Sequence, residues 1–397
     1  MVRALRQVVV GPAGRQGLLV FLVARLVLTL WAAFMVVLLP PPAVADEAVR
    51  PYVGSPILAS GPAGLLLGPW QRFDTMRYLA LARDGYTDQN SVFPPLYPLL
   101  IRGAGGVLGL LGVPQAAANL LAALLIANLA ALAAFVLLHH VTSQELDRKA
   151  ANRALVYLAF FPAGFFLFAG YTESLFLCFA LGAVWAMRRA RPGLAGLLGL
   201  LAALTRLTGA VLVVPLAYEY LRQRGFNWRE VRWSGLAVGL PLSGSLAFLG
   251  WRMAAGLAPI GQVYQQYWYQ VTGLPGRDLL VALGTLVRGT GPRAGEFTLF
   301  FDLFCALLLA VTTVLAFRRL GTTYGLYSLM MLGFMLLPAS DLKPLYSFSR
   351  YALAFFPTFM VLADLGHRPW VNRLILYPSL ALYLYFSGQF FIWGWVA

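Results

Sequence analysis

The chain has 397 residues, of which 60% are hydrophobic and only 11% are charged, with a mean hydropathy of +0.74. Soluble globular domains carry about 25% charged residues, so this composition excludes an ordinary soluble protein. The chain has a net charge of +15, and such a basic balance can indicate nucleic-acid binding. The arginines, however, are dispersed between apolar runs, as is typical of loops held against an anionic leaflet, and we expect no nucleic-acid partner.

Lysine and cysteine usage add two further expectations. Lys149 and Lys343 are the only lysines, which indicates a high-GC coding sequence and favours a bacterial source. The two cysteines, Cys178 and Cys305, lie inside apolar runs. Neither a disulfide framework nor a cysteine metal cluster is therefore expected.

The N-terminal region is basic and then apolar. Arg3, Arg6 and Arg15 precede an apolar stretch over residues 17–39, and Ala43-Val44-Ala45 resembles a signal-peptidase site. The apolar region of a signal peptide is usually about 7–15 residues long, whereas this one is longer and contains Arg25. We therefore predict an uncleaved first membrane helix, with cleavage as the alternative.

Apolar runs long enough to cross the roughly 30 Å hydrocarbon layer recur along the chain. Basic clusters separate them, and the positive-inside rule places these clusters in the cytoplasm. The clusters are Arg3/Arg6/Arg15, Arg148/Lys149/Arg153, Arg188/Arg189/Arg191, Arg222/Arg224/Arg229/Arg232, Arg318/Arg319 and Arg368/Arg373. The pattern predicts about eleven membrane helices. They cover residues 17–40, 115–140, 153–169, 174–188, a hairpin of two short helices over 193–221, then 233–251, 296–317, 322–338, 350–366 and 370–394.

This topology describes an all-α polytopic membrane protein, with one domain over residues 1–397. It leaves two long segments on the non-cytoplasmic side, a first outer loop at 41–113 and a second at 252–295. The first outer loop should contain an amphipathic helix over 73–84, ended by Gly85, and an interfacial helix over 99–112. Most acidic residues fall on or near this outer side, and acids contribute little to topology itself, so a catalytic face is one explanation.

The outer segment 70–98 contains the first candidate site residues. At about 100° per residue, four side chains share one arc of the predicted 73–84 helix. They are Asp74, Arg77, Tyr78 and Asp84. An ordinary surface helix with its charges in water is the alternative.

Two further candidates sit where predicted helices turn. Glu173, in Tyr171-Thr172-Glu173-Ser174, is either a helix-capping acid favoured by the dipole or a functional group. Arg206, in Thr205-Arg206-Leu207-Thr208-Gly209, lies at membrane depth, where a charge is costly and needs a partner such as Glu173 or a lipid phosphate.

Arg350 begins a predicted helix at the outer boundary, beside Tyr351. Its side chain either reaches the headgroups or binds phosphate, because a planar guanidinium suits bidentate anion binding. The aromatic and amide-rich stretch 262–270 is explained by an interfacial belt, although sugars and prenyl chains bind similar surfaces. No Walker, dinucleotide-binding or Gly-x-Ser-x-Gly motif is present.

Several of these strings, taken in order over about residues 70–360, resemble one family. Asp74-x-x-x-Tyr78, Gly85-Tyr86 and Phe93-Pro94-Pro95-Leu96-Tyr97-Pro98 resemble its "WD-x-x-(H/W)-(F/Y)…GY…FFPLYP" signature. Phe161-Pro162 and Tyr171-Thr172-Glu173-Ser174-Leu175-Phe176 resemble "FP…FF…YSESLF". Leu204-Thr205-Arg206-x-Thr208-Gly209 resembles "ATR-x-(N/T)G", and Ser349-Arg350-Tyr351 with Phe356-Pro357 resembles "RY…FP". The family is the PIG-V-like mannosyltransferases, within glycosyltransferase superfamily C.

The resemblance implies a multi-helix enzyme that takes a sugar from a polyprenyl-phosphate donor on the outer or lumenal face. Asp74 matches the first-outer-loop acid that is expected to be catalytic, and Arg206 and Arg350 are expected to bind the donor phosphate. The pocket would include Arg77, Tyr78, Asp84, Tyr97, Tyr171, Glu173 and Tyr351. The chain departs from the family at Phe73, which replaces Trp, and at Thr75-Met76-Arg77, which puts the shape of the acceptor pocket in doubt.

We therefore predict an inverting glycosyltransferase, most simply a mannosyltransferase, in the cell membrane with its active site on the extracytoplasmic face. Its partners would be polyprenyl-phosphate mannose, membrane lipids, and a glycan, lipid or protein hydroxyl as acceptor. A divalent metal is left open and is not required, because Asp74 and Asp84 do not form a tight Asp-x-Asp pair. The alternatives are a transporter or lipid flippase, and a surface-polysaccharide ligase or polymerase. No internal repeat supports the transporter.

Overall fold

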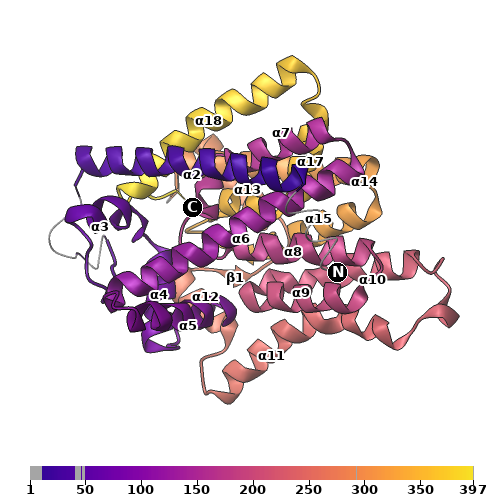
Figure 1. Cartoon of the computed structure of the whole chain (residues 1–397), viewed down its shortest axis with the longest axis horizontal. Helices are drawn as coiled ribbons and strands as arrows, with labels where there is room; N and C mark the ends of the chain where they lie inside the picture. Colours follow the sequence, from indigo (N-terminus) through magenta and orange to yellow (C-terminus); the bar gives the residue numbers. More distant parts are fainter. Residues whose placement is uncertain (1–10, 41–45, 47–49, 292, 397) are drawn as a thin grey trace. The chain divides into compact units, whose positions relative to one another are not determined.

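The structure is a computed structural model that describes residues 11–40, 46, 50–291 and 293–396. The predicted basic residues Arg3 and Arg6 and the Ala43-Val44-Ala45 sequence lie outside the described residues. The part of the chain that is described is mostly helical (Figure 1). Within the described residues, two strands of two residues each, β1 (Val271–Thr272) and β2 (Pro338–Ala339), pair in antiparallel orientation.

The chain forms two compact units, each described here by itself. The first comprises residues 1–86, 95–178 and 362–396, and the second comprises 87–94 and 179–361. The expected single domain over 1–397 stays a prediction.

In the first unit, α6 (Gln115–Glu145) lies against α2 (Pro12–Leu38), α5 (Leu96–Leu110) and α7 (Arg148–Ala159) (Figure 1). The close approach of α2 to α6 depends on Gly17, where a Cβ would lie 2.8 Å from Val136 Cγ2. Asp147 caps α7 by accepting a hydrogen bond from the backbone of Ala150 at 2.7 Å. The unit also contains α3 (Gly61–Leu66), η1 (Gly68–Trp70), α4 (Asp74–Asp84), η2 (Gly164–Leu167), the start of α8 (Glu173–Arg188) and α18 (Pro369–Phe391).

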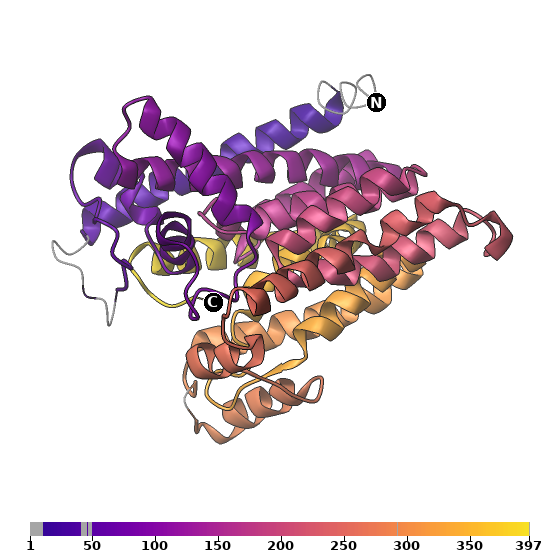
Figure 2. The same ribbon diagram turned by 90° about the horizontal axis from the view of Figure 1, so that it is seen from below.

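The second unit contains the predicted hairpin, formed by α9 (Pro192–Thr205), η3 (Leu207–Leu212) and α10 (Val213–Arg222). Glu219 of α10 is completely buried, and its carboxylate accepts hydrogen bonds from Arg222, Gln223 and Thr323. α14 (Phe297–Arg319) and α15 (Thr322–Met335) lie side by side (Figure 2, orange). The remaining elements are η4 (Trp228–Glu230), η5 (Trp233–Gly239), α11 (Leu240–Ala254), α12 (Ile260–Trp268), α13 (Arg277–Arg288), α16 (Phe348–Tyr351), η6 (Ala352–Ala354) and α17 (Phe356–Leu365).

Five of the described helices are long and apolar enough to cross a membrane, so the chain is a multi-pass membrane protein. They are residues 12–38, 117–145, 233–254, 297–319 and 369–391. A sixth would be the bent pair 348–354 and 356–365. The predicted count of about eleven also includes α7, α8 and α15, which are shorter than 18 residues.

Two predicted helices are broken where proline follows. The helix expected over 153–169 ends at Ala159, close to Pro162, and resumes as the 3₁₀ turn η2. The helix expected over 350–366 bends by 83° between η6 and α17, just before Pro357. Proline lacks the N–H group that a continuous helix needs, which is consistent with a helix ending shortly before Pro162 and a new helix beginning at Phe356, one residue before Pro357.

Candidate functional site

Asp74 is the first residue of α4, where a negative charge is favoured by the helix dipole. The residue before it, Phe73, has φ +47°, a backbone conformation that residues other than glycine rarely adopt. Its ring packs edge-on against two tryptophans, with centroid distances of 5.1 Å to Trp393 and 5.3 Å to Trp395. Aromatic contacts with the C-terminal segment therefore hold the turn that starts the acid-bearing helix.

Arg72 reinforces this turn from inside the first unit. Its guanidinium is 2% exposed and donates two hydrogen bonds to the Phe391 carbonyl, at 2.9 and 2.6 Å, and another to the Gly68 carbonyl. It also lies over the Trp393 ring at 5.1 Å. Burial lowers the pKa of Arg72 to about 10, so the group stays charged at neutral pH. Arg72 is thus a structural cation whose donors are directed at the protein.

The turn between η2 and α8 also contacts the start of α4. The backbone N–H of Asp74 donates to the Tyr171 hydroxyl at 3.2 Å, and the Tyr78 and Thr172 hydroxyls are 3.3 Å apart. Gly170 permits this contact, because a Cβ there would lie 2.7 Å from Thr75 Cγ2. The predicted residues Asp74, Tyr78 and Tyr171 are therefore brought together.

Tyr97 and Glu173 lie in the same region of the first unit. The Tyr97 ring packs edge-on against Tyr78 at 5.1 Å, and its hydroxyl donates to the Ala123 carbonyl at 3.0 Å. Glu173 is the first residue of α8, directly after Thr172, and it is 5% exposed. Two tyrosines and a buried acid thus belong to the surroundings of α4's first turns.

Arg77 and Asp84 differ from this group. Arg77 is half-buried on α4. Asp84 ends α4, about 15 Å along the axis from Asp74. Its side chain is 54% exposed and forms a two-pronged ion pair with Arg83, at 2.8 and 2.7 Å, which lowers the pKa of the Asp84 carboxyl. The predicted helix is present, so these side chains share one side of it, but Asp84 and Asp74 lie at opposite ends of that helix.

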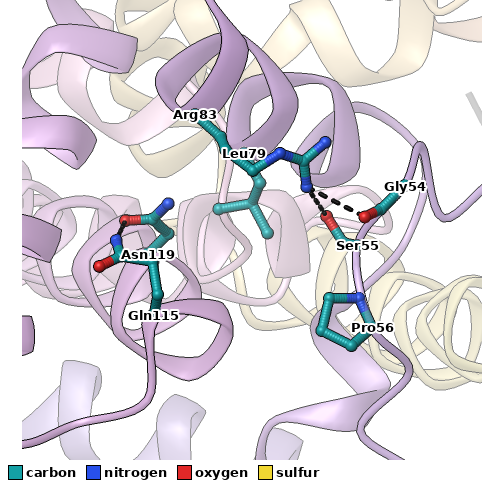
Figure 3. A pocket seen from close by; sticks show the side chains of 7 residues that line it. All are labelled: Gly54, Ser55, Pro56, Leu79, Arg83, Gln115 and Asn119. Carbon is teal, nitrogen blue, oxygen red and sulfur yellow. Dashed lines mark hydrogen bonds between the residues drawn. The ribbon is translucent and has the colours of Figure 1, made fainter.

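Arg83 also lines a cavity on this part of α4 (Figure 3). Its guanidinium donates to the Gly54 carbonyl and to the Ser55 hydroxyl, both at 3.2 Å, and so ties residues 53–55 to α4. Across the cavity, Gln115 donates to Asn119 at 2.9 Å. The cavity lining comprises Gly54, Ser55, Pro56, Leu79, Arg83, Gln115 and Asn119, and includes none of the predicted site residues.

In the second unit, Arg206 lies at the break between α9 and η3, with extended backbone at φ −149° and ψ 137°. The reversal is tight because Gly209 packs on the α9 backbone, where a Cβ would lie 2.3 Å from the nitrogen of Ala203. The Thr205 hydroxyl donates back to the Leu201 carbonyl at 2.7 Å and ends the helix. The Thr-Arg-x-Thr-Gly sequence thus makes a helix break that presents Arg206.

Arg206 and Arg350 share one aromatic ring. Their guanidinium carbons lie 4.9 and 5.1 Å from the Tyr351 ring centroid, and Arg350 also donates to the Tyr351 hydroxyl at 3.3 Å. The turn that carries Arg350 is fixed by Asp302, which accepts a hydrogen bond from the backbone of Ser349 at 2.8 Å. We call Arg206, Arg350 and Tyr351 the arginine cluster.

Tyr264, which lies near Tyr351 and Arg206, and Arg252, which lies near Tyr264, were not predicted. Burial and Tyr351 raise the pKa of Tyr264 to about 12, while the charges of Arg206 and Arg252 act in the opposite direction. Arg252 is 2% exposed and donates to the Ser91 carbonyl and hydroxyl, both at 2.7 Å. Tyr264 stood in a stretch attributed to the interfacial belt. The signal available for Arg252 was its position directly after the predicted helix 233–251, since an arginine next to an apolar helix can be functional.

Among the described residues, no three His, Cys, Asp or Glu side chains gather closely enough to hold a metal ion. The chemistry offered is that of a carboxylate beside tyrosines in the first unit, and of paired guanidinium groups in the second. Such groups suit proton abstraction and anion binding, respectively.

Comparison with known proteins agrees with the family resemblance. No curated protein matches the sequence significantly. A solved structure with some similarity is that of ArnT from Cupriavidus metallidurans bound to undecaprenyl phosphate, with a TM-score of 0.47 and 15% identity, covering 95% of this chain and 76% of that one. The family model of Mannosyltransferase (PIG-V) matches residues 15–227, more than half of the chain, and includes the motifs around Asp74, Glu173 and Arg206. The chain therefore belongs to the PIG-V mannosyltransferase family.

Proposed function

We propose that this glycosyltransferase moves a mannosyl group from a polyprenyl-phosphate donor to an acceptor hydroxyl, with inversion, on the non-cytoplasmic face of the cell membrane. The observation that carries the proposal is the arginine cluster, in which two guanidinium groups lie 4.9 and 5.1 Å from the centre of the Tyr351 ring. Family membership supports glycosyl transfer over transport of a lipid or solute.

In the proposed reaction, Asp74 is the general base. The acceptor O–H proton passes to the Asp74 carboxylate while the acceptor oxygen bonds to the sugar's anomeric carbon. The bond from that carbon to the phosphate oxygen breaks, and polyprenyl phosphate leaves with the electron pair. The contacts of Asp74 and Tyr78 with Tyr171 and Thr172 support a fixed position for the base.

Arg206 and Arg350 would bind the donor phosphate and stabilise the charge that develops on it. Planar guanidinium groups bind phosphate oxygens in pairs, and such electrostatic stabilisation is worth several kcal/mol in a dry site. Arg252 is a weaker candidate for phosphate contact, because its donors are directed to Ser91 and Ala258. Asp84 is left out of the mechanism because it is paired with Arg83.

The proposal requires that Asp74, Glu173, Arg206 and Arg350 face one outer cavity. The test uses purified protein in nanodiscs, labelled polyprenyl-phosphate mannose, and extracts that supply glycan, lipid and protein hydroxyls. We expect a mannosylated product whose anomeric configuration is opposite to that of the donor. Transfer only from a pyrophosphate-linked donor would favour a ligase or polymerase. Movement of the lipid between leaflets without transfer would favour a flippase.

A further inference from the structure

The helix α13 (Arg277–Arg288) has two unlike faces. Asp278, Ala282 and Thr285 are buried. Leu280, Leu283 and Val287 are exposed by 74%, 50% and 79%. At about 100° per residue, these three apolar side chains lie within an arc of roughly 60°, opposite the buried face. We call Leu280, Leu283 and Val287 the apolar stripe. A stripe of this kind on a helix that is otherwise packed marks a surface covered by another apolar phase.

The surroundings of α13 identify that phase. α13 packs on α14, a helix long and apolar enough to cross the membrane. α14 begins only nine positions after α13 ends (297 − 288), and its first turns expose Phe297, Phe300 and Phe304. An extended chain of that length reaches at most about 30 Å. α13 therefore lies within reach of the bilayer surface where α14 enters.

The charge at the end of the stripe also fits a lipid surface. Arg288, the last residue of α13, is exposed, whereas Arg277, the first, forms an ion pair with Asp341 at 2.7 Å. A helix with one apolar face and an arginine beside it typically lies in the plane of the headgroup layer, where anionic lipids attract the cation. We infer that α13 is an in-plane membrane anchor whose apolar stripe inserts into the bilayer.

The buried face of α13 is hydrogen-bonded to the segment that leads to Arg350. The two carboxylate oxygens of Asp278 accept hydrogen bonds from the backbones of Ser340 and Leu345, at 2.9 and 3.2 Å. β1, just before α13, pairs with β2 in the same segment. Arg293, just after α13, donates to the Pro344 carbonyl at 2.7 Å. The anchor thereby sets the height of Arg350 at the surface where a lipid phosphate would lie, a consequence that rests on the proposed function.

The insertion is tested by fluorescence quenching in nanodiscs. A Leu283→Cys variant, with Cys178 and Cys305 replaced by alanine, carries an environment-sensitive fluorophore. Quenching by nitroxide-labelled lipids should be strongest when the nitroxide is near the headgroup, because in-plane helices insert only about 5–10 Å. A Gln89→Cys variant, exposed in the turn that follows α4, is the matched control and should lose little fluorescence. Equal, weak quenching of both would overturn the anchor. Weak quenching that increases on dilution, with a change of oligomeric state, would overturn it in favour of a second copy.

A second measurement tests the connection to Arg350. Leu283→Glu should raise the donor KM several-fold in lipid, because a charge on the stripe is expelled from the bilayer, while Leu283→Ile should behave as the wild type. Melting curves of all variants show whether each is folded. An unchanged donor KM in folded Leu283→Glu would overturn the connection. If Arg350 does not bind the donor, Arg350→Lys leaves donor KM unchanged while the fluorophore of the Leu283→Cys variant is still quenched, so the two failures are distinguishable.

Discussion

Asp74 is placed by its neighbours on both sides. Phe73 has a left-handed backbone conformation, which costs of order 1–3 kcal/mol and persists only where surrounding contacts hold it. The packing of Phe73 on Trp393 and the hydrogen bonds of Arg72 supply those contacts. The Tyr171 hydroxyl then accepts from the Asp74 backbone. These contacts involve the Asp74 backbone and its neighbours, so substitution of the side chain is expected to affect chemistry more than folding.

Asp74→Asn should reduce transfer by at least about a hundredfold, because a positioned base contributes roughly 10²–10⁴-fold and an amide does not take up the proton. The measurement is the initial rate with matched amounts of folded protein. The melting temperature and the donor Kd should change little. Transfer at close to the wild-type rate would mean that another group, such as Glu173, accepts the proton.

Arg350→Lys should weaken donor use more than folding. The substitution keeps the positive charge, but it loses the planar fork and much of the contact with the Tyr351 ring. The check is the donor KM of the purified variant beside its melting temperature. Arg229→Lys, an exposed change in a predicted cytoplasmic loop, is the control. A wild-type donor KM in Arg350→Lys would argue against phosphate contact by this residue.

Part of the candidate site was predictable from residue patterns. Asp74, Tyr78 and Tyr171 were named from the sequence, and contacts bring them together. The sequence also indicated Arg206, Arg350 and Tyr351 as site residues. It did not predict that Arg206 packs on the Tyr351 ring, because helical spacing cannot relate residues 145 positions apart (351 − 206). Asp84 was predicted wrongly to lie near Asp74. Helical spacing gives the direction of a side chain around the axis, but it gives neither the distance along the axis nor the ion pair with Arg83.

At the scale of elements, the sequence predicted most helices to within a few residues. Apolar periodicity and capping signals are local, so α4, α6, α14 and α18 follow from them. The interruptions near Pro162 and Pro357 were missed, because the apolar runs continue through them while the backbone hydrogen bonding does not. Close helix approaches, such as that at Gly209, depend on tertiary packing and have no local signal of comparable strength.

Gly209→Ala should destabilise the hairpin of α9 and α10 by about 1–3 kcal/mol, because the added Cβ would overlap the α9 backbone at Ala202 and Ala203. Thermal unfolding in detergent is the measurement. Gly193→Ala is the matched control, since it lies in α9 with no atom within 4 Å of the added Cβ, and helix propensity favours alanine by up to about 1 kcal/mol. Equal melting temperatures for the two variants would contradict the packing argument.

At the scale of the whole molecule, the basic loops and the outer loops are predicted to lie on opposite faces of the membrane. Gln265→Cys, in the second outer loop, should react with an impermeant thiol reagent in right-side-out vesicles. Arg229→Cys, in a basic loop, should react only after permeabilisation. Both positions are exposed, so access to the reagent depends on the membrane and not on burial. Labelling of both from outside would contradict the proposed topology.

The contact between Arg72 and Phe391 also has a consequence for biosynthesis. The two residues are 319 positions apart, so nearly the whole chain must be translated before Arg72 finds its acceptor. Until then a buried cation and a left-handed turn lack their support, and the helix that starts at Asp74 should be only loosely ordered. A nascent or prematurely terminated chain would therefore be inserted in the membrane but catalytically silent, and activity should appear only once synthesis reaches the final helix.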